Sequence, residues 1–170
     1  QRRRLVVSST FAASLTGTIM PIGTVQETMP IGAVEVFDLI HDYDRRLDWD
    51  TLLSEAYIEP QYNAAGKGVI TVCRGRRILG NIAIRTEYVT FERGRVAAVR
   101  MLDRTSIFDT FAASIRHLNL SDGRSSVVYK FNFSARPFYL RPILEPIMLI
   151  VLKWETRKRL SSLRDYITRC

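Results

Sequence analysis

The plainest pattern of hydrophobic and polar positions lies at residues 125–135, where the two kinds of residue alternate. Every second position is apolar: Val127, Tyr129, Phe131 and Phe133. Successive side chains of a strand point to opposite faces, so this spacing predicts a strand with one buried and one wet face. Asp122 and Gly123 precede it, and an Asp-Gly pair favours the positive φ angles of a tight hairpin turn.

Weaker alternation, broken by turn residues such as glycine, proline and asparagine, predicts the remaining strands. We place them at residues 22–29, 55–60, 68–74, 78–92, 95–102 and 110–120. Between the first two strands, the spacing of apolar residues changes to that of a helix at residues 31–41. A second short helix or turn follows at about residues 45–53.

The last segment, residues 142–168, contains no glycine and begins at a proline, as many helices do. It predicts one long helix. An apolar stripe runs along its first half and continues with some drift: Leu144, Ile147, Val151, Trp154, Leu160, Leu163 and Ile167. The first half is apolar all round and the second half is basic. Because a helix that is apolar all round is normally buried on more than one side, we expect the first half to be buried.

This order of elements predicts an α+β fold, because a run of strands is followed by a helix instead of alternating with helices. A curved antiparallel sheet of about six to seven strands would bury its inner face by wrapping the terminal helix. The two short helices after the first strand would close one end of the sheet. We therefore predict a helix-grip domain at residues 22–170, preceded by an N-terminal extension at residues 1–21.

Length and composition fit one globular domain. The chain has 170 residues, 46% hydrophobic and 25% charged, and no linker divides it. Its net charge of +8 favours anionic ligands or surfaces without identifying one. Two distant cysteines, Cys73 and Cys170, predict a reducing, cytoplasmic setting. The arginines at residues 2–4 loosely resemble a twin-arginine export signal, so export is the lesser alternative.

The motifs of several enzyme classes are missing from the sequence. His41 and His117 have no partner at metal-ligand spacing, and no phosphate-binding glycine loop or serine nucleophile elbow occurs. We therefore expect no metal and no cofactor. The aspartates at residues 42–50 are mixed with arginines and predict helix caps and surface ion pairs. His117 lies on a predicted strand, where it is a candidate acid or base.

Five positions near the first helices carry a resemblance to a known family: Val36, Phe37, Leu39, Asp42 and Trp49. With the order of elements, they resemble the START-like superfamily. The subgroup that fits is the bacterial polyketide cyclase/dehydrase and lipid transport family, which is related in fold to the major birch-pollen allergen. The resemblance covers roughly residues 22–168 and implies a central tunnel between sheet and helix. Family members that bind coenzyme Q carry Pro-Trp-Cys after the first helices, whereas residues 47–50 here read Leu-Asp-Trp-Asp.

The predicted site lies where the aromatic strand face meets the terminal helix. Pockets for small molecules are mostly apolar with a few placed polar groups. Our candidate ligand-binding residues are Trp49, Arg85, Arg100, Phe111, Ser114, Tyr129, Phe131, Phe133, Met148, Val151 and Trp154. An inward arginine, such as Arg85 or Arg100, would pair bidentately with a ligand carboxylate or phosphate. The candidate catalytic residues are His117, Tyr129 and Arg100.

These features predict binding or transport of a hydrophobic small molecule: a lipid, a polyketide or an isoprenoid-like compound. One alternative is a polyketide cyclase or dehydratase that uses polar groups of the cavity. Another is contact between the basic end of the terminal helix, residues 153–169, and an anionic membrane or a protein partner. Nucleic acid is not expected, because no stacking aromatic residues interleave with these charges. The sequence leaves the oligomeric state open, with a homodimer among the options.

Overall fold

The computed structural model of the chain describes residues 20–77 and 80–169. Predictions about the export-like signal at the N-terminus and about Cys170 lie outside these residues. Among the described residues, no helix is both long enough and apolar enough to cross a bilayer.

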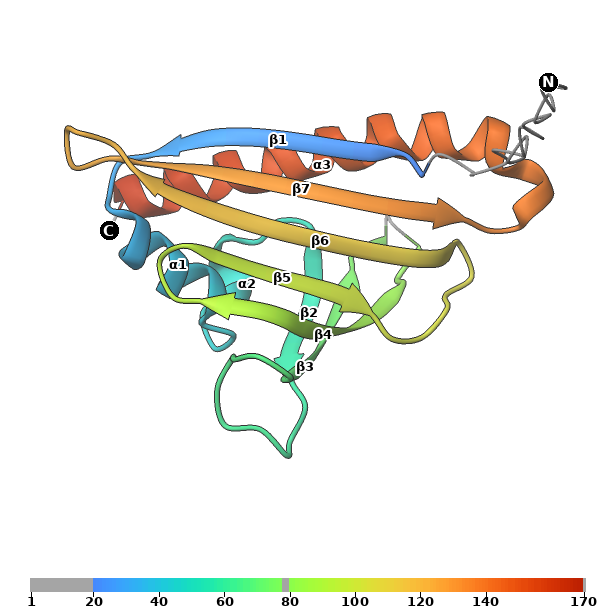
Figure 1. The fold of residues 1–170 in the computed structure, drawn as a ribbon, viewed down its shortest axis with the longest axis horizontal. Helices are drawn as coiled ribbons and strands as arrows, with labels where there is room; N and C mark the ends of the chain where they lie inside the picture. Colours follow the sequence, from blue (N-terminus) through green and yellow to red (C-terminus); the bar gives the residue numbers. More distant parts are fainter. Residues whose placement is uncertain (1–19, 78–79, 170) are drawn as a thin grey trace, which may run out of the picture.

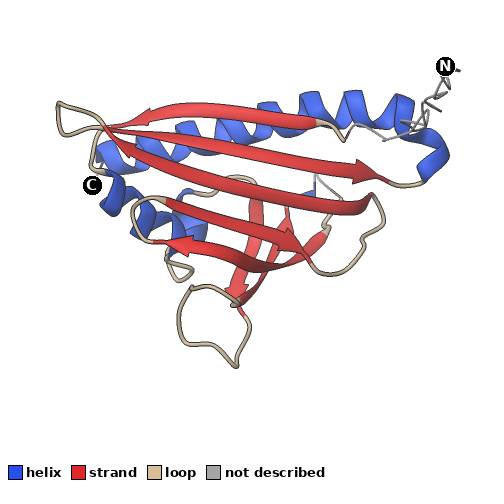
Figure 2. Cartoon of the chain, viewed as in Figure 1, coloured by secondary structure: helices blue, strands red, loops and turns tan. Residues whose placement is uncertain are grey.

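The fold is one antiparallel sheet with helices against its inner face (Figures 1 and 2). The strands are β1 (Ile22–Met29), β2 (Leu53–Ile58), β3 (Ile70–Gly75), β4 (Ala83–Glu92), β5 (Val96–Met101), β6 (Phe108–Asn119) and β7 (Ser125–Ala135). The helices are α1 (Ala33–His41), α2 (Arg46–Trp49), the short η2 (Phe138–Leu140) and the long α3 (Arg141–Arg169). The strand order β1-β7-β6-β5-β4-β3-β2 puts β1 and β2 at opposite edges, so α1 and α2 connect one edge of the sheet to the other. The predicted α+β helix-grip architecture is confirmed.

The strands agree with the alternation in the sequence to within two residues at each end, except at the start of β4. The predictions for residues 22–29 and 125–135 match β1 and β7. The strand expected at residues 78–92 begins only at Ala83. Gly80 and Asn81 have φ values of 73° and 54°, and this left-handed backbone continues the turn instead of the strand.

Helix α1 closes one end of the sheet. Its first turn is capped from two sides: the Gly32 N–H donates to the Glu35 carboxylate at 3.0 Å, and the Ala33 N–H donates to Asn119 Oδ1 at 2.7 Å. These bonds satisfy backbone donors that a helix start leaves free. The buried face of the helix carries Val36, Phe37 and Ile40. The helix is thereby held against β6 and β7.

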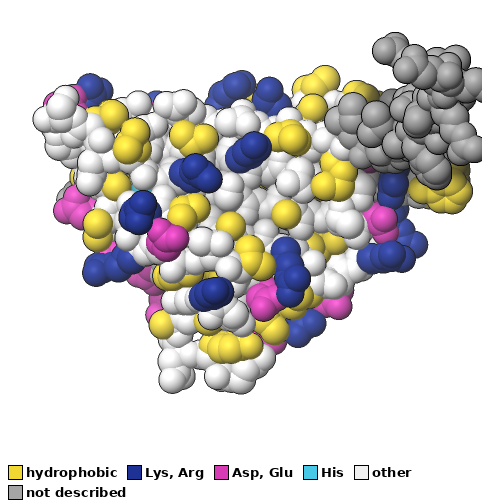
Figure 3. Space-filling model, in the orientation of Figure 1, with side chains coloured by type: hydrophobic (Ala, Val, Ile, Leu, Met, Phe, Trp, Pro, Cys, Tyr) yellow, Lys and Arg dark blue, Asp and Glu magenta, His cyan; other side chains and the backbone are white. Residues whose placement is uncertain are grey.

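The core lies between the inner face of the sheet and the second half of α3. Leu160 and Leu163 of α3 pack with Val25, Met29 and Val127 of β1 and β7. A second cluster surrounds Phe131 and Phe133, whose side chains are almost completely buried. Full burial of each such side chain contributes about 2–3 kcal/mol. On the opposite face of the molecule, charged side chains lie among apolar ones (Figure 3).

The prediction that the first half of α3 is buried on more than one side is wrong. Ile143, Ile150 and Trp154 are 64%, 71% and 55% exposed. The sheet covers only one side of the helix, so these outward side chains are not covered by the described part of the sheet.

Candidate ligand-binding cavity

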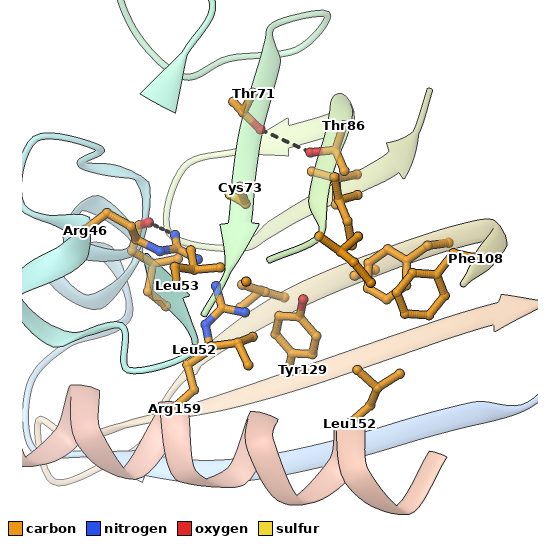
Figure 4. A pocket seen from close by; sticks show the side chains of 18 of the residues that line it. Arg46, Leu52, Leu53, Thr71, Cys73, Thr86, Phe108, Tyr129, Leu152 and Arg159 are labelled. Atoms are coloured by element: carbon orange, nitrogen blue, oxygen red, sulfur yellow. Dashed lines mark hydrogen bonds between the residues drawn. The ribbon is translucent and has the colours of Figure 1, made fainter. Parts of the chain in front are cut away.

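A cavity of about 490 Å³ separates the inner face of the sheet from α3 (Figure 4). Most of its lining is apolar and includes Ile84, Val99, Phe108, Phe111, Met148 and Leu152. The space exists because the strands that curl away from α3 carry short inward side chains. These are Thr71, Cys73, Thr86, Ala97 and Ala113. They cannot reach the helix, so α3 packs mainly against β1 and β7, on one side of the sheet.

The cavity reaches the surface beside α3. Ile147 and Val151 line it, yet they are 56% and 42% exposed, and Gly80 on the facing turn is also exposed. A residue that touches both the cavity and solvent marks an opening between them. These exposed lining residues place the open side of the cavity beside α3, near Gly80.

One end of the cavity carries a buried charge cluster. Asp50 Oδ2 lies 2.8 Å from Arg46 Nε and 2.8 Å from Arg159 Nε, and the Asp50 side chain is fully buried. Arg46 also donates to the Ile40 carbonyl, and its guanidinium lies 4.7 Å from the Trp49 ring centroid. Burial raises the pKa of the Asp50 carboxyl, whereas the charge and hydrogen bond of Arg46 act to lower it. Arg46 and Arg159 both line the cavity.

Hydroxyl groups also line the cavity. The Tyr43 and Tyr88 hydroxyls lie 3.0 Å apart, and those of Thr71 and Thr86 lie 3.1 Å apart. In Figure 4 the Tyr129 hydroxyl points into the space beside Arg159. Burial raises the pKa of each of the three tyrosines, so all three are neutral hydrogen-bonding groups at physiological pH.

The two histidines occupy different places. His41 lines the cavity, and its Nδ1–H donates to the Phe37 carbonyl at 2.7 Å. Burial lowers the pKa of His41 to about 3. His117, the predicted acid or base, does not line the cavity: it lies under α1, with its ring 5.3 Å from that of Phe37. Burial lowers its pKa to about 4, and neither ring nitrogen has a hydrogen-bond partner among the described residues.

The structure brings four of the predicted ligand-binding residues to the cavity wall: Phe111, Tyr129, Met148 and Val151. Three others lie behind the wall as core: Trp49, Phe131 and Phe133, each at most 2% exposed. They support the lining residues and do not face the space itself.

The other four predicted residues lie outside the cavity. Arg85 pairs with Glu59 and Asp103. Arg100 pairs with Glu87 across the β4–β5 ladder. Ser114 lies on the outer face, and Trp154 is on the exposed side of α3 beside Lys158.

Arg85, Arg100 and Ser114 point outward because side chains alternate between the two faces of a strand. Each is next in sequence to a lining residue, as Arg85 is to Thr86, Arg100 to Val99 and Ser114 to Ala113. Neighbours in a strand point to opposite faces, so these three side chains point away from the cavity.

The sequence analysis missed Arg46, Arg159 and His41 as cavity residues. Arg159 had a usable signal, because it lies seven residues after Leu152 and four before Leu163, on the inward stripe of α3. It was grouped instead with the solvated basic residues of the helix. His41 had a usable signal too, because it lies four residues after Phe37 on the apolar face of the predicted helix. Arg46 had no such signal, since its inward direction depends on how α2 crosses the end of the sheet.

A curved sheet that grips a long C-terminal helix around an apolar cavity defines the helix-grip class of proteins. No family model matches the sequence, and no curated protein does. Among solved structures, a START superfamily protein from Mycobacterium smegmatis aligns with a TM-score of 0.72 and 9% identity, over 87% of this chain and 97% of that one. The Zhui aromatase/cyclase from a Streptomyces species aligns with a TM-score of 0.68 and 18% identity, over 88% and 94%. Ara h 8.0201 aligns with a TM-score of 0.66 and 10% identity, over 89% and 99%. This chain thus has the START-like helix-grip fold.

Proposed function

We propose that this protein binds and carries a hydrophobic small molecule in the cavity between the sheet and α3. The observation that carries the proposal is an apolar cavity of about 490 Å³, within the roughly 300–1,000 Å³ common for ligand sites. Every 100 Å² of apolar ligand surface buried there would contribute about 2.5 kcal/mol. A lipid, a polyketide or an isoprenoid-like compound suits this lining. A cytoplasmic location, proposed from the cysteine content, is part of the same interpretation.

The similarity of fold to a START superfamily protein and an aromatase/cyclase supports a ligand in this place. Catalysis of the cyclase or dehydratase type has weaker support. General acid–base catalysis works best when the pKa of the group lies near the working pH. In this cavity the pKa of His41 is about 3 and that of Cys73 is about 11. Binding without acid–base chemistry is therefore the function that we favour.

A matched pair of variants tests ligand binding. Ala113 points into the cavity, whereas its neighbour Ala112 points to the outer face of the same strand. Ala113→Phe should fill the space and Ala112→Phe should not. Binding of the neutral fluorophore N-phenyl-1-naphthylamine would be measured for both, with native mass spectrometry of freshly purified protein to detect a retained ligand. Loss of binding in Ala113→Phe alone supports the proposal, and full binding by a folded Ala113→Phe variant contradicts it.

A second candidate function is contact with an anionic membrane through α3. Its first half exposes the apolar side chains Ile143, Ile147, Ile150 and Trp154. At helical spacing, Arg157 and Lys158 continue the same face one turn further on, and both are exposed. Apolar and basic side chains on one helix face are typical of helices that lie at an anionic bilayer surface. The opening of the cavity next to Ile147 and Val151 would then face the membrane.

Co-sedimentation with vesicles tests this contact. We expect binding to phosphatidylglycerol-containing vesicles, weaker binding to purely phosphatidylcholine vesicles, and a loss of binding in Ile150→Glu. Val89→Glu is a matched control, because Val89 is an exposed apolar residue on β4. Equal sedimentation of both variants, with no dependence on anionic lipid, would refute the contact.

A further inference from the structure

The charged end of the cavity contains more positive than negative charge. Arg46 and Arg159 both lie against the single carboxylate of Asp50. Among the described residues, neither arginine forms an ion pair with any other carboxylate. Glu155 is one helical turn before Arg159 and makes no ion pair with it. At least one positive charge is therefore left without a partner at this end of the cavity.

Arg159 carries this excess charge toward the cavity. Its side chain is only 9% exposed, and it forms no hydrogen bond with any other described residue beyond its approach to Asp50. Its guanidinium carbon lies 5.6 Å from the Tyr129 ring centroid and 6.0 Å from that of Trp49. Figure 4 shows the group pointing into the space, between Leu52 and Tyr129. Arg46, in contrast, is held by Asp50 and the Ile40 carbonyl.

A buried charge without a partner is costly, because the interior does not replace the water that it loses. The guanidinium is a planar fork of donors that matches a carboxylate bidentately. One anionic group beside Arg159 would balance the charge and use these donors. A second anionic group would itself be unbalanced.

We propose that the ligand of this cavity is an amphipathic monoanion, a carboxylic acid on an apolar body, whose acid group binds Arg159. The inference rests on the proposed binding function and adds the chemical class of the ligand. The apolar body would extend from Arg159 toward Phe108, which lies at the other end of the cavity in Figure 4. The Tyr129 hydroxyl points into the same space and would donate a further hydrogen bond to this acid group.

Three ligands that differ only in the head group test the charge. Dodecanoic acid, dodecan-1-ol and dodecylamine would each displace N-phenyl-1-naphthylamine from the wild-type protein at neutral pH. We expect the acid to bind about tenfold more tightly than the alcohol, since a charge-assisted hydrogen bond typically contributes that much. The amine should bind most weakly. Equal affinity for acid and alcohol would overturn the inference while leaving apolar binding intact, whereas no displacement by any ligand would count against the binding function itself.

Two variants locate the effect. Arg159→Gln should remove the preference for the acid, because the affinity for the acid should fall about tenfold relative to that for the alcohol. The variant should still fold, because the Arg46–Asp50 pair stays balanced. Arg157→Gln removes the same charge from an exposed position of α3 and should keep the preference. A folded Arg159→Gln variant that still prefers the acid would refute the site. If Arg159→Gln does not fold, the head-group series on the wild-type protein alone decides the charge of the ligand.

Discussion

Acid should destabilise this protein at an unusually high pH, because two histidines are buried in the neutral form. The pKa is about 3 for His41 and about 4 for His117, against an ordinary value of 6.5. A histidine whose pKa is lowered on folding takes up a proton more readily in the unfolded chain. The stability is therefore complete above pH 6.5 and falls as the pH drops toward 4.

The magnitude follows from the difference in proton binding. At pH 5 both histidines would be almost fully protonated in the unfolded chain and still neutral in the folded one. Each would then lower the free energy of unfolding by roughly 2 kcal/mol relative to pH 7. Together they would remove about 4 kcal/mol, a large share of the 5–15 kcal/mol that keeps a typical domain folded. Asp38, whose pKa is lowered mainly by its hydrogen bond from Arg93, loses its contribution only below about pH 4.

Urea unfolding at pH 7 and at pH 5, followed by tryptophan fluorescence, measures this loss. Trp49 is buried and should report unfolding. His117→Leu should halve the difference between the two pH values, since it removes one of the two groups and no hydrogen bond. A difference below about 1 kcal/mol for the wild-type protein would refute the reasoning, because it would mean that both histidines bind protons equally in the two states.

Three further variants are expected to lower the free energy of unfolding, each measured by denaturant titration at pH 7. Gly23→Ala should cost about 1–3 kcal/mol, because its Cβ would lie 2.1 Å from the Phe131 ring; no loss would show that the ring moves freely. Phe133→Ala should cost about 3–5 kcal/mol as a fully buried ring is deleted, and a loss under 1 kcal/mol would mean that the core refills the space. Asp50→Asn should cost about 3 kcal/mol or more by leaving two buried arginines without a carboxylate; a neutral result would contradict the charge cluster.

The fold could be predicted from the sequence because alternation along a strand carries strong information. A shift of one residue would move every apolar side chain of β7 to the wet face, so the pattern at Val127, Phe131 and Phe133 allows only one orientation. The same alternation puts Phe111, Ala113 and Ile115 on one face of β6, and all three line the cavity. Applied consistently, it would also have excluded Ser114.

The cavity itself could not be predicted, because it depends on volumes and not on polarity. Thr71 and Thr86 are common strand residues, and Cys73 is often buried, so none of them signals a space. They leave a space only because β3 and β4 curl away from α3, and the amount of curl is set by the whole sheet. The exposed side of α3 was misjudged for a related reason. Ile143 and Ile150 are apolar, but nothing in their spacing shows on how many sides a helix is covered.

The strands and the helices contribute different kinds of residue to the cavity lining. The cavity residues on the described strands are apolar residues, threonines, tyrosines, Cys73 and Gly75, and none of them is charged. The histidine and the two arginines of the lining, His41, Arg46 and Arg159, come from α1, α2 and α3. The strands therefore set the shape of the space, and the helices set its charge. Since Arg46 is on α2 and Asp50, which balances it, directly follows that helix, one substitution on α3, at Arg159, can change the net charge of the cavity without altering a strand. Substitutions at position 159 should accordingly change which ligand charge the protein prefers, and substitutions at inward strand positions such as Ala113 should change which ligand size it accepts.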